Sequence, residues 1–146
     1  MIHNKSIQVD IVSAEAELFS GKASMLIVSG AMGELGIVHG HSPLLTKLKP
    51  GHVRIIREKE GDEQLLIYVS GGLLEVQPYT VTILAQVAVR GEELDEAAAL
   101  AAKERAEQML KSRDHADFDY SLATAELAQA VAQLKTIRDL RKKVKV

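Results

Sequence analysis

The change from strand chemistry to helix chemistry falls within residues 87–99, which read VAVRGEELDEAAA. The valines at its start are β-branched and favour strands, whereas the alanines at its end favour helix. Gly91 marks a turn between them. Asp95 is a typical N-cap residue, and the surrounding glutamates suit the positive end of a helix dipole. The stretch therefore predicts an all-β module over residues 1–90 and an α-helical segment over residues 91–146.

The rest of the chain divides at the same place. All ten glycines lie at or before Gly91, and all three prolines precede it. Valine and isoleucine number 19 in residues 1–90 but only four after Gly91, whereas twelve alanines lie in 97–132. Since Gly and Pro mark turns, we expect many short strands in the first part and long helices in the second.

The first part predicts an antiparallel β-sandwich or flattened barrel. Strict alternation over 7–11 and 81–87 predicts half-buried strands, and 52–58 predicts another strand. The continuous apolar runs 25–28 and 65–69 predict strands that are buried on both faces. Polar turns are expected at 58–62 and 70–72.

The second part predicts an antiparallel hairpin of two amphipathic helices joined by a polar link at 112–119. We expect the first helix to bury Ala98, Ala102, Ala106, Met109 and Leu110. The second, from about Tyr120, is expected to bury Ala123, Leu127, Ala130, Leu134 and Ile137, with Arg141 and Val144 extending the stripe. Because alanine buries little apolar area, this hairpin should undock or unfold locally at low cost.

Composition excludes several function classes. The chain has no cysteine, which removes disulfides, thiol nucleophiles and cysteine-ligated metals. Aromatic residues are only 3%, which argues against stacking surfaces for bases or sugars. The net charge of −2 provides no overall basic field for nucleic acid, so no nucleic-acid partner is expected.

Two local patterns contain residue types that occur in phosphate or metal sites, but neither predicts such a site. The glycines of residues 30–36 match neither a dinucleotide fingerprint nor a P-loop, so we interpret them as a loop between strands. His39 and His41 would share one strand face, yet a metal site needs a third ligand. Glu34, expected in the loop, is the nearest candidate, and we favour a turn or interface role over a metal site or a metal-dependent enzyme.

The C-terminal run, residues 135–146, contains six basic residues and one acidic residue, Asp139. One interpretation is a solvated helix end whose cations complement the dipole. The other is a mobile basic helix that meets an acidic surface of a partner protein, as in a generic adaptor. Both remain open on these residues alone.

Dispersed motifs resemble the epsilon subunit of the bacterial F-type ATP synthase over essentially the whole chain. They are ELGI at 34–37, GHSPLL at 40–45, KPG at 49–51, SGGLLEV at 70–76 and LDEA at 94–97. The resemblance implies a noncatalytic central-stalk subunit. Its sandwich would bind the gamma subunit and the ring of c subunits. Its helices would extend toward the alpha and beta subunits to inhibit ATP hydrolysis.

The same resemblance assigns individual residues. Glu34 and His41 would lie in a loop that faces the c ring. Arg138, Arg141, Lys142 and Lys143 would meet acidic segments of the beta subunits in the extended state.

Some relatives bind ATP in the hairpin. Here Asp95 and Arg105 match that pattern, but Ala98 replaces the expected arginine, so we expect weak ATP binding or none, and no other cofactor. The implied location is peripheral, at the cytoplasmic face of the bacterial inner membrane, with membrane contact only through the complex.

Overall fold

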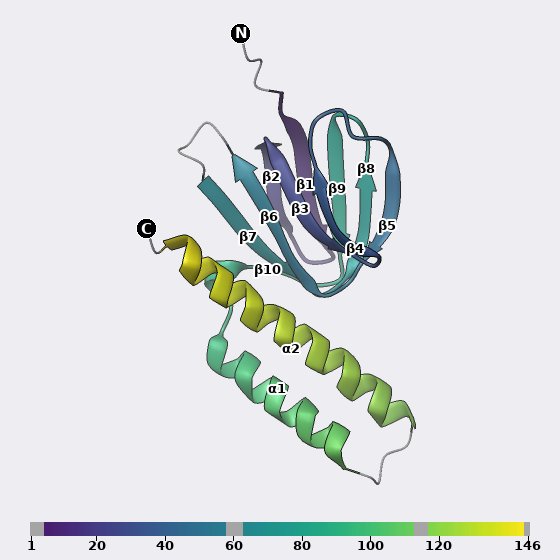
Figure 1. Cartoon of the computed structure of the whole chain (residues 1–146), viewed down its shortest axis with the longest axis vertical. Helices are drawn as coiled ribbons and strands as arrows, with labels where there is room; N and C mark the ends of the chain where they lie inside the picture. Colours follow the sequence, from purple (N-terminus) through teal and green to yellow (C-terminus); the bar gives the residue numbers. More distant parts are fainter. Residues whose placement is uncertain (1–4, 58–62, 113–116, 145–146) are drawn as a thin grey trace.

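The computed structural model describes residues 5–57, 63–112 and 117–144. Ten strands come first and two long helices follow (Figure 1). The strands are β1 (Ile7–Ser13), β2 (Glu17–Ala23), β3 (Met25–Gly30), β4 (Gly33–Ile37), β5 (Leu44–Leu48), β6 (Gly51–Arg57), β7 (Glu63–Val69), β8 (Gly72–Val76), β9 (Thr80–Ala85) and β10 (Ala88–Arg90). The predicted sandwich or flattened barrel is confirmed. The turn expected at 58–62 lies outside the described residues.

The strands form one continuous hydrogen-bonded sheet that folds over on itself, in the order β10-β7-β6-β3-β5-β8-β9-β1-β2, with β4 added beside β3. The two end strands of this sheet, β10 and β2, lie next to each other. The Arg90 guanidinium of β10 donates to the Leu18 carbonyl oxygen of β2 over 3.2 Å. The expectation of a purely antiparallel sheet is wrong at one place, since β1 and β9 pair in parallel. Because β1 and β9 are not joined by a short loop, the connection between them does not require an antiparallel pairing.

The core lies between the two layers of the sandwich and is built from alternate strand residues. Ile7, Val9 and Ile11 of β1 are fully buried, as the alternation predicts. The run at 25–28 is not buried on both faces, because β3 alternates between buried and half-buried residues. By contrast, 66–69 is buried throughout, since a helix covers the outer face of β7.

The turn between β7 and β8 requires glycine. Gly72 has a φ of 149°, and a Cβ there would lie 2.1 Å from the Leu84 carbonyl oxygen. The same turn limits the length of β9. This strand ends at Ala85, two residues earlier than the alternation predicts, because the backbone of Gln86 and Val87 bonds to Gly71 and Ser70.

A short 3-10 turn, η2 (Gly91–Glu93), leads into the helices α1 (Glu96–Lys111) and α2 (Asp117–Val144). Asp95 is the N-cap of α1, since its Oδ1 accepts from the Ala98 amide over 3.2 Å. Ala106 on the predicted face of α1 is buried, but at the start of the helix Ala99 is buried in place of Ala98, which is exposed. The helix α2 begins three residues earlier than predicted.

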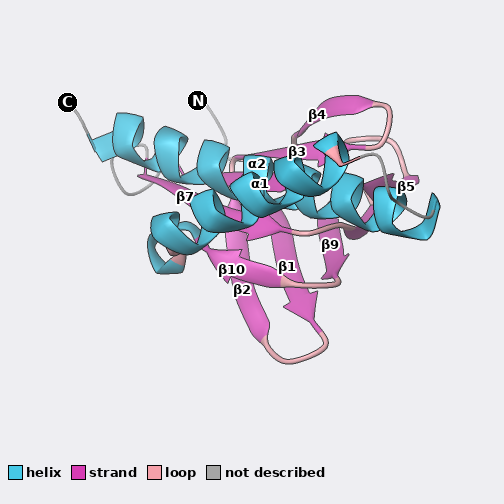
Figure 2. Ribbon diagram, turned by 90° about the horizontal axis from the view of Figure 1, so that it is seen from below, coloured by secondary structure: helices cyan, strands magenta, loops and turns pink. Residues whose placement is uncertain are grey.

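The helix α2 lies between α1 and the sandwich (Figures 1 and 2). One stripe of α2, which includes Ala123, Ala130 and Ile137, is buried as predicted. A second stripe, which includes Ala132 and Thr136, faces β6 and β7 and was not predicted. The hairpin is therefore attached to the sandwich mainly through α2.

Candidate functional site

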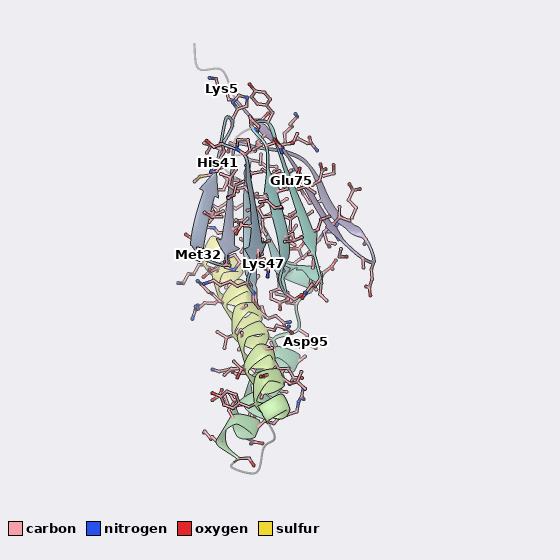
Figure 3. The ribbon with its side chains drawn as sticks, turned by 90° about the vertical axis from the view of Figure 1, so that its right-hand side faces the viewer. Lys5, Met32, His41, Lys47, Glu75 and Asp95 are labelled. Atoms are coloured by element: carbon pink, nitrogen blue, oxygen red, sulfur yellow. The ribbon has the colours of Figure 1, made fainter. Side chains whose placement is uncertain are left out.

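The outer face of β5, β8 and β9 carries exposed apolar side chains and is not covered by the helices. Leu45, Leu73 and Leu84 are 69%, 43% and 54% exposed. Leu73 lies between Lys47 and Leu84 in the cross-strand register, so the three form one row. Figure 3 views the molecule from the side on which β5 lies and labels Lys47 and Glu75 there. We call the residues Leu45, Lys47, Leu73 and Leu84 the open face.

A shallow pocket of about 530 Å³ adjoins the open face, and its lining includes Lys47, Leu73, Leu84 and Gln86. Apolar surface of this kind, bordered by polar groups, is typical of protein–protein contact. Sequence reasoning missed it. The signal was the apolar doublets Leu44-Leu45, Leu73-Leu74 and Ile83-Leu84, in which one residue of each pair must point away from the core.

Glu34 and His41 do not share one loop. The glycine-rich segment is a hairpin, with Ala31 and Met32 at its turn, and Glu34 lies on β4 opposite Ser29. His41 lies in the connection that follows β4, where its Nδ1 is 2.7 Å from the Ser42 carbonyl oxygen. Met32, which is 97% exposed, and His41 lie toward opposite ends of the sandwich (Figure 3).

His39 and His41 do not share a strand face, because both lie in the turn after β4. The His39 ring packs on the Tyr79 ring, with centroids 4.7 Å apart. The described part of the chain contains no group of three side chains suited to hold a metal ion. The turn interpretation of these histidines fits this geometry better than a metal site does.

The basic residues of α2 have different surroundings. Arg138 and Lys142 are exposed. Arg141 is 63% exposed, and its two terminal nitrogens bond both carboxylate oxygens of Glu96 on α1. Arg141 therefore links the two helices here. The side chain of Lys143 lies outside the described residues.

The residues of the ATP-binding pattern are only partly brought together. The Asp95 side chain caps α1 by accepting a hydrogen bond from the Ala98 amide. Arg105 is exposed and lies ten residues further along, about 15 Å of helix. Ala98 is exposed and supplies no charge where the pattern has a guanidinium.

The contact between α2 and the sandwich contains a further polar group that sequence reasoning missed. The His52 side chain on β6 is 8% exposed, and its Nε2 lies 3.3 Å from Asp139 Oδ2 of α2. Its Nδ1 lies 3.3 Å from Thr136 Oγ1. Thr136 and Asp139 follow His52 by 84 and 87 positions, so no local spacing predicts these contacts. They form only because α2 docks on the sandwich.

Two pieces of the chain match known families. Residues 6–91 match the beta-sandwich domain of the ATP synthase delta/epsilon chain, and residues 92–138 match its long alpha-helix domain. No helix in the described ranges is long and apolar enough to span a membrane.

Named relatives agree with these matches. An ATP synthase epsilon chain of Legionella pneumophila (strain Corby) is 58% identical over 137 residues, which cover 94% of this chain and 96% of that one. An ATP synthase epsilon chain of Nitrosococcus oceani is 57% identical over 139 residues, or 95% and 97% of the two chains. A chain from the Euglena gracilis mitochondrial ATP synthase has the same fold, with a TM-score of 0.69 at 23% identity, over 99% of this chain and 84% of that one.

Proposed function

The chain belongs to the ATP synthase delta/epsilon chain family, and on that premise we propose that it couples rotation of the c ring to ATP synthesis and conditionally inhibits ATP hydrolysis. It acts as the epsilon subunit of the central stalk, a structural subunit rather than a catalytic one. One observation carries the inhibitory part of the proposal: the hairpin is attached to the sandwich mainly through α2.

The sandwich is the coupling part of the subunit. Its large apolar core makes it a rigid body that can transmit torque. The open face supplies apolar area for the gamma subunit, and its exposed leucines support that assignment. Glu34 and His41 contact the c ring from separate elements. The subunit contacts the membrane only through this complex, at the cytoplasmic face of the bacterial inner membrane. The ion that the complex transports is the proton.

The hairpin is the regulatory part. In the extended state, Arg138, Arg141, Lys142 and Lys143 face acidic segments of the beta subunits. Extension breaks the Arg141–Glu96 pair, which is exposed and contributes less than about 1 kcal/mol. The cations thereby become available to the partner at low cost. ATP binding in the hairpin is weak or absent, since Ala98 stands where a guanidinium would bind phosphate.

The test compares free and tethered hairpins. The chain has no cysteine, so Gln86→Cys and Ala125→Cys can be joined by a short bis-maleimide; both positions line one pocket between α2 and the sandwich. We expect the untethered double variant to inhibit ATP hydrolysis by a matched alpha–beta–gamma core. The tethered one should bind equally well without inhibiting. Equal inhibition by both forms would contradict a hairpin mechanism, and failure of both to bind would contradict the stalk assignment.

A second test concerns the cations. Arg138→Ala combined with Lys142→Ala should weaken inhibition without weakening binding to the core. Lys111→Ala is the matched control, because Lys111 is an exposed cation at the end of α1 and outside the basic run. If the control weakens inhibition as much as the double variant does, the effect is general electrostatics and not a specific contact.

A further inference from the structure

The contact between α2 and the sandwich is concentrated at the C-terminal end of the helix. The first half of α2 extends beyond the strands (Figures 1 and 3). An open pocket of about 540 Å³ separates that half from the sandwich, and its lining includes Pro50, Gln86 and Ala125. Among the described side chains of α2 before Ala132, none is hydrogen-bonded or ion-paired to the sandwich. The first half of the helix therefore does little to hold α2 in place.

Near the end of α2, three consecutive residues reach three different elements. Successive side chains of a helix point about 100° apart, so neighbours can meet different partners. Asp139 faces His52 of β6, Leu140 lies beside the η2 turn and β7, and Arg141 bonds to Glu96 of α1. One turn of α2 thus touches the sandwich, the connection and the other helix at once.

The contact with β6 is polar. Asp139 Oδ2 lies 3.3 Å from His52 Nε2, and Thr136 Oγ1, one turn earlier, lies 3.3 Å from His52 Nδ1. The Thr136 hydroxyl donates its proton to the Ala132 carbonyl oxygen over 2.7 Å, so its oxygen is the acceptor for the ring. The His52 side chain is 8% exposed, and both of its ring nitrogens face α2. The helix cannot leave without breaking both contacts.

The contact with the η2 turn is apolar. Leu140 Cδ2 and Leu66 Cβ each lie 3.5 Å from the position that a Cβ would take on Gly91. Both Gly91 and Leu66 are buried. Leu140 is therefore packed into the corner between the η2 turn and β7. This contact holds the last turns of α2 against the point where the hairpin leaves the sandwich.

The contact with α1 fixes the position of the same turn. The two terminal nitrogens of Arg141 bond both carboxylate oxygens of Glu96, the first residue of α1. A two-point pair of this kind is directional, even where solvent limits its strength. It aligns the end of α2 with the start of α1, beside the η2 turn.

We propose that these residues form a clamp that by itself keeps the hairpin docked on the sandwich; the clamp comprises Thr136, Asp139, Leu140 and Arg141. Loss of its contacts releases α2 from β6 and β7, whereas α1 and α2 stay paired through their buried alanines. The first half of α2 then separates as well, because nothing described there binds the sandwich.

The consequence of the clamp rests on the proposed function. Arg141 belongs both to the clamp and to the cations assigned to the beta subunits, and Arg138 and Lys142 lie on the same turn of α2. That turn can therefore serve docking or inhibition, but not both at once. Docking sequesters the segment that the extended state uses.

The experiment measures how often α2 leaves the sandwich in the full chain. The chain has no cysteine, so Ala132→Cys adds one thiol on the buried side of α2 that faces β6 and β7. In a second chain, Ala123→Cys adds one in the part of α2 beyond the strands, where α1 covers it. A maleimide reacts with a covered thiol only after opening. With slow reagent, the labelling rate therefore follows the population of the open state.

We expect Leu140→Ala to accelerate labelling at position 132 by about tenfold, since the three carbons that it removes are partly buried. Asp139→Ala should accelerate it a few-fold, because His52 loses one partner. Labelling at position 123 should not change. Leu122→Ala is the matched control, since it removes the same carbons from an exposed leucine of α2 outside the clamp. It should leave the rate at position 132 unchanged.

Three results would overturn the clamp. They are a Leu140→Ala chain that labels at position 132 no faster than the parent, a Leu122→Ala chain that labels as fast as Leu140→Ala, and equal acceleration at positions 132 and 123. Equal acceleration would mean that the hairpin unfolds instead of undocking.

A second probe covers the case in which Ala132→Cys does not fold. Gln133→Cys then carries the thiol, because Gln133 is half-buried and faces Tyr68 of β7. The same outcomes apply at that position. No other subunit is used, so the clamp can fail while the proposed function holds, and the reverse.

Discussion

The sandwich and the hairpin bury different side chains. The core of the sandwich is filled by isoleucine, valine and leucine, such as Ile11, Leu74 and Ile83, all completely buried. The hairpin buries mainly alanines, among them Ala99, Ala106, Ala123 and Ala130. An isoleucine has three more carbons than an alanine, so each such position contributes roughly 2 kcal/mol more burial free energy. One region is therefore built to hold one conformation, and the other to change at low cost.

The largest expected effect is in the sandwich core. Ile83→Ala should lower the free energy of unfolding by about 3 kcal/mol, since it removes a fully buried side chain and leaves a cavity. Urea denaturation followed by circular dichroism would measure it. Leu84→Ala is the matched control, because the neighbouring leucine is 54% exposed and should cost less than about 1 kcal/mol. Equal losses at the two positions would contradict the assigned core.

The next effect tests the close approach of the helices. Ala130→Leu should destabilise the hairpin by about 1–3 kcal/mol, because Ala130 is 2% exposed and a larger side chain there must displace its neighbours. Amide hydrogen exchange should accelerate in α1 and α2 and stay unchanged in the strands. Ala101→Leu, at an exposed position of α1, should leave exchange as it was. Faster exchange throughout the sandwich would mean that the two regions are not separable.

A smaller effect is expected at the start of the hairpin. Asp95→Ala removes the side chain that caps α1 and should cost about 1 kcal/mol of helix stability. Asp95→Asn should retain most of it, since asparagine caps nearly as well. Hydrogen exchange of the first turn of α1 would separate the two variants. Similar exchange rates in both would show that charge at the helix end matters more than the hydrogen bond.

The smallest effect is expected for the pair between Arg141 and Glu96. Arg141→Ala should reduce hairpin stability by less than about 1 kcal/mol, because the Arg141 and Glu96 side chains are 63% and 41% exposed and solvent screens the pair. A double-mutant cycle with Glu96→Gln would isolate the coupling, which should shrink as salt is added. Lys142→Ala, the adjacent exposed cation, should show no coupling with Glu96. A coupling that is unchanged by salt would contradict a screened surface pair.

Local sequence patterns were enough to predict much of this fold. Its Val, Ile, Gly and Pro residues predicted the β-module, its alanines predicted the helices, and Asp95 was identified as a cap. These features depend on local backbone preference and on periodicity, which short windows of sequence express directly. The recognisable motifs from residue 34 to residue 97 likewise indicated the family.

The faces that pack together could not be predicted in the same way. The parallel pairing of β1 with β9, the exposed leucines of the open face and the docking of α2 on β6 all depend on contacts between distant segments. The one-residue displacement from Ala98 to Ala99 has the same cause, since several neighbouring alanines offered equivalent stripes. His52 and Asp139 are 87 residues apart and meet because the helix returns to the sheet. Nothing local in either segment could have predicted that contact.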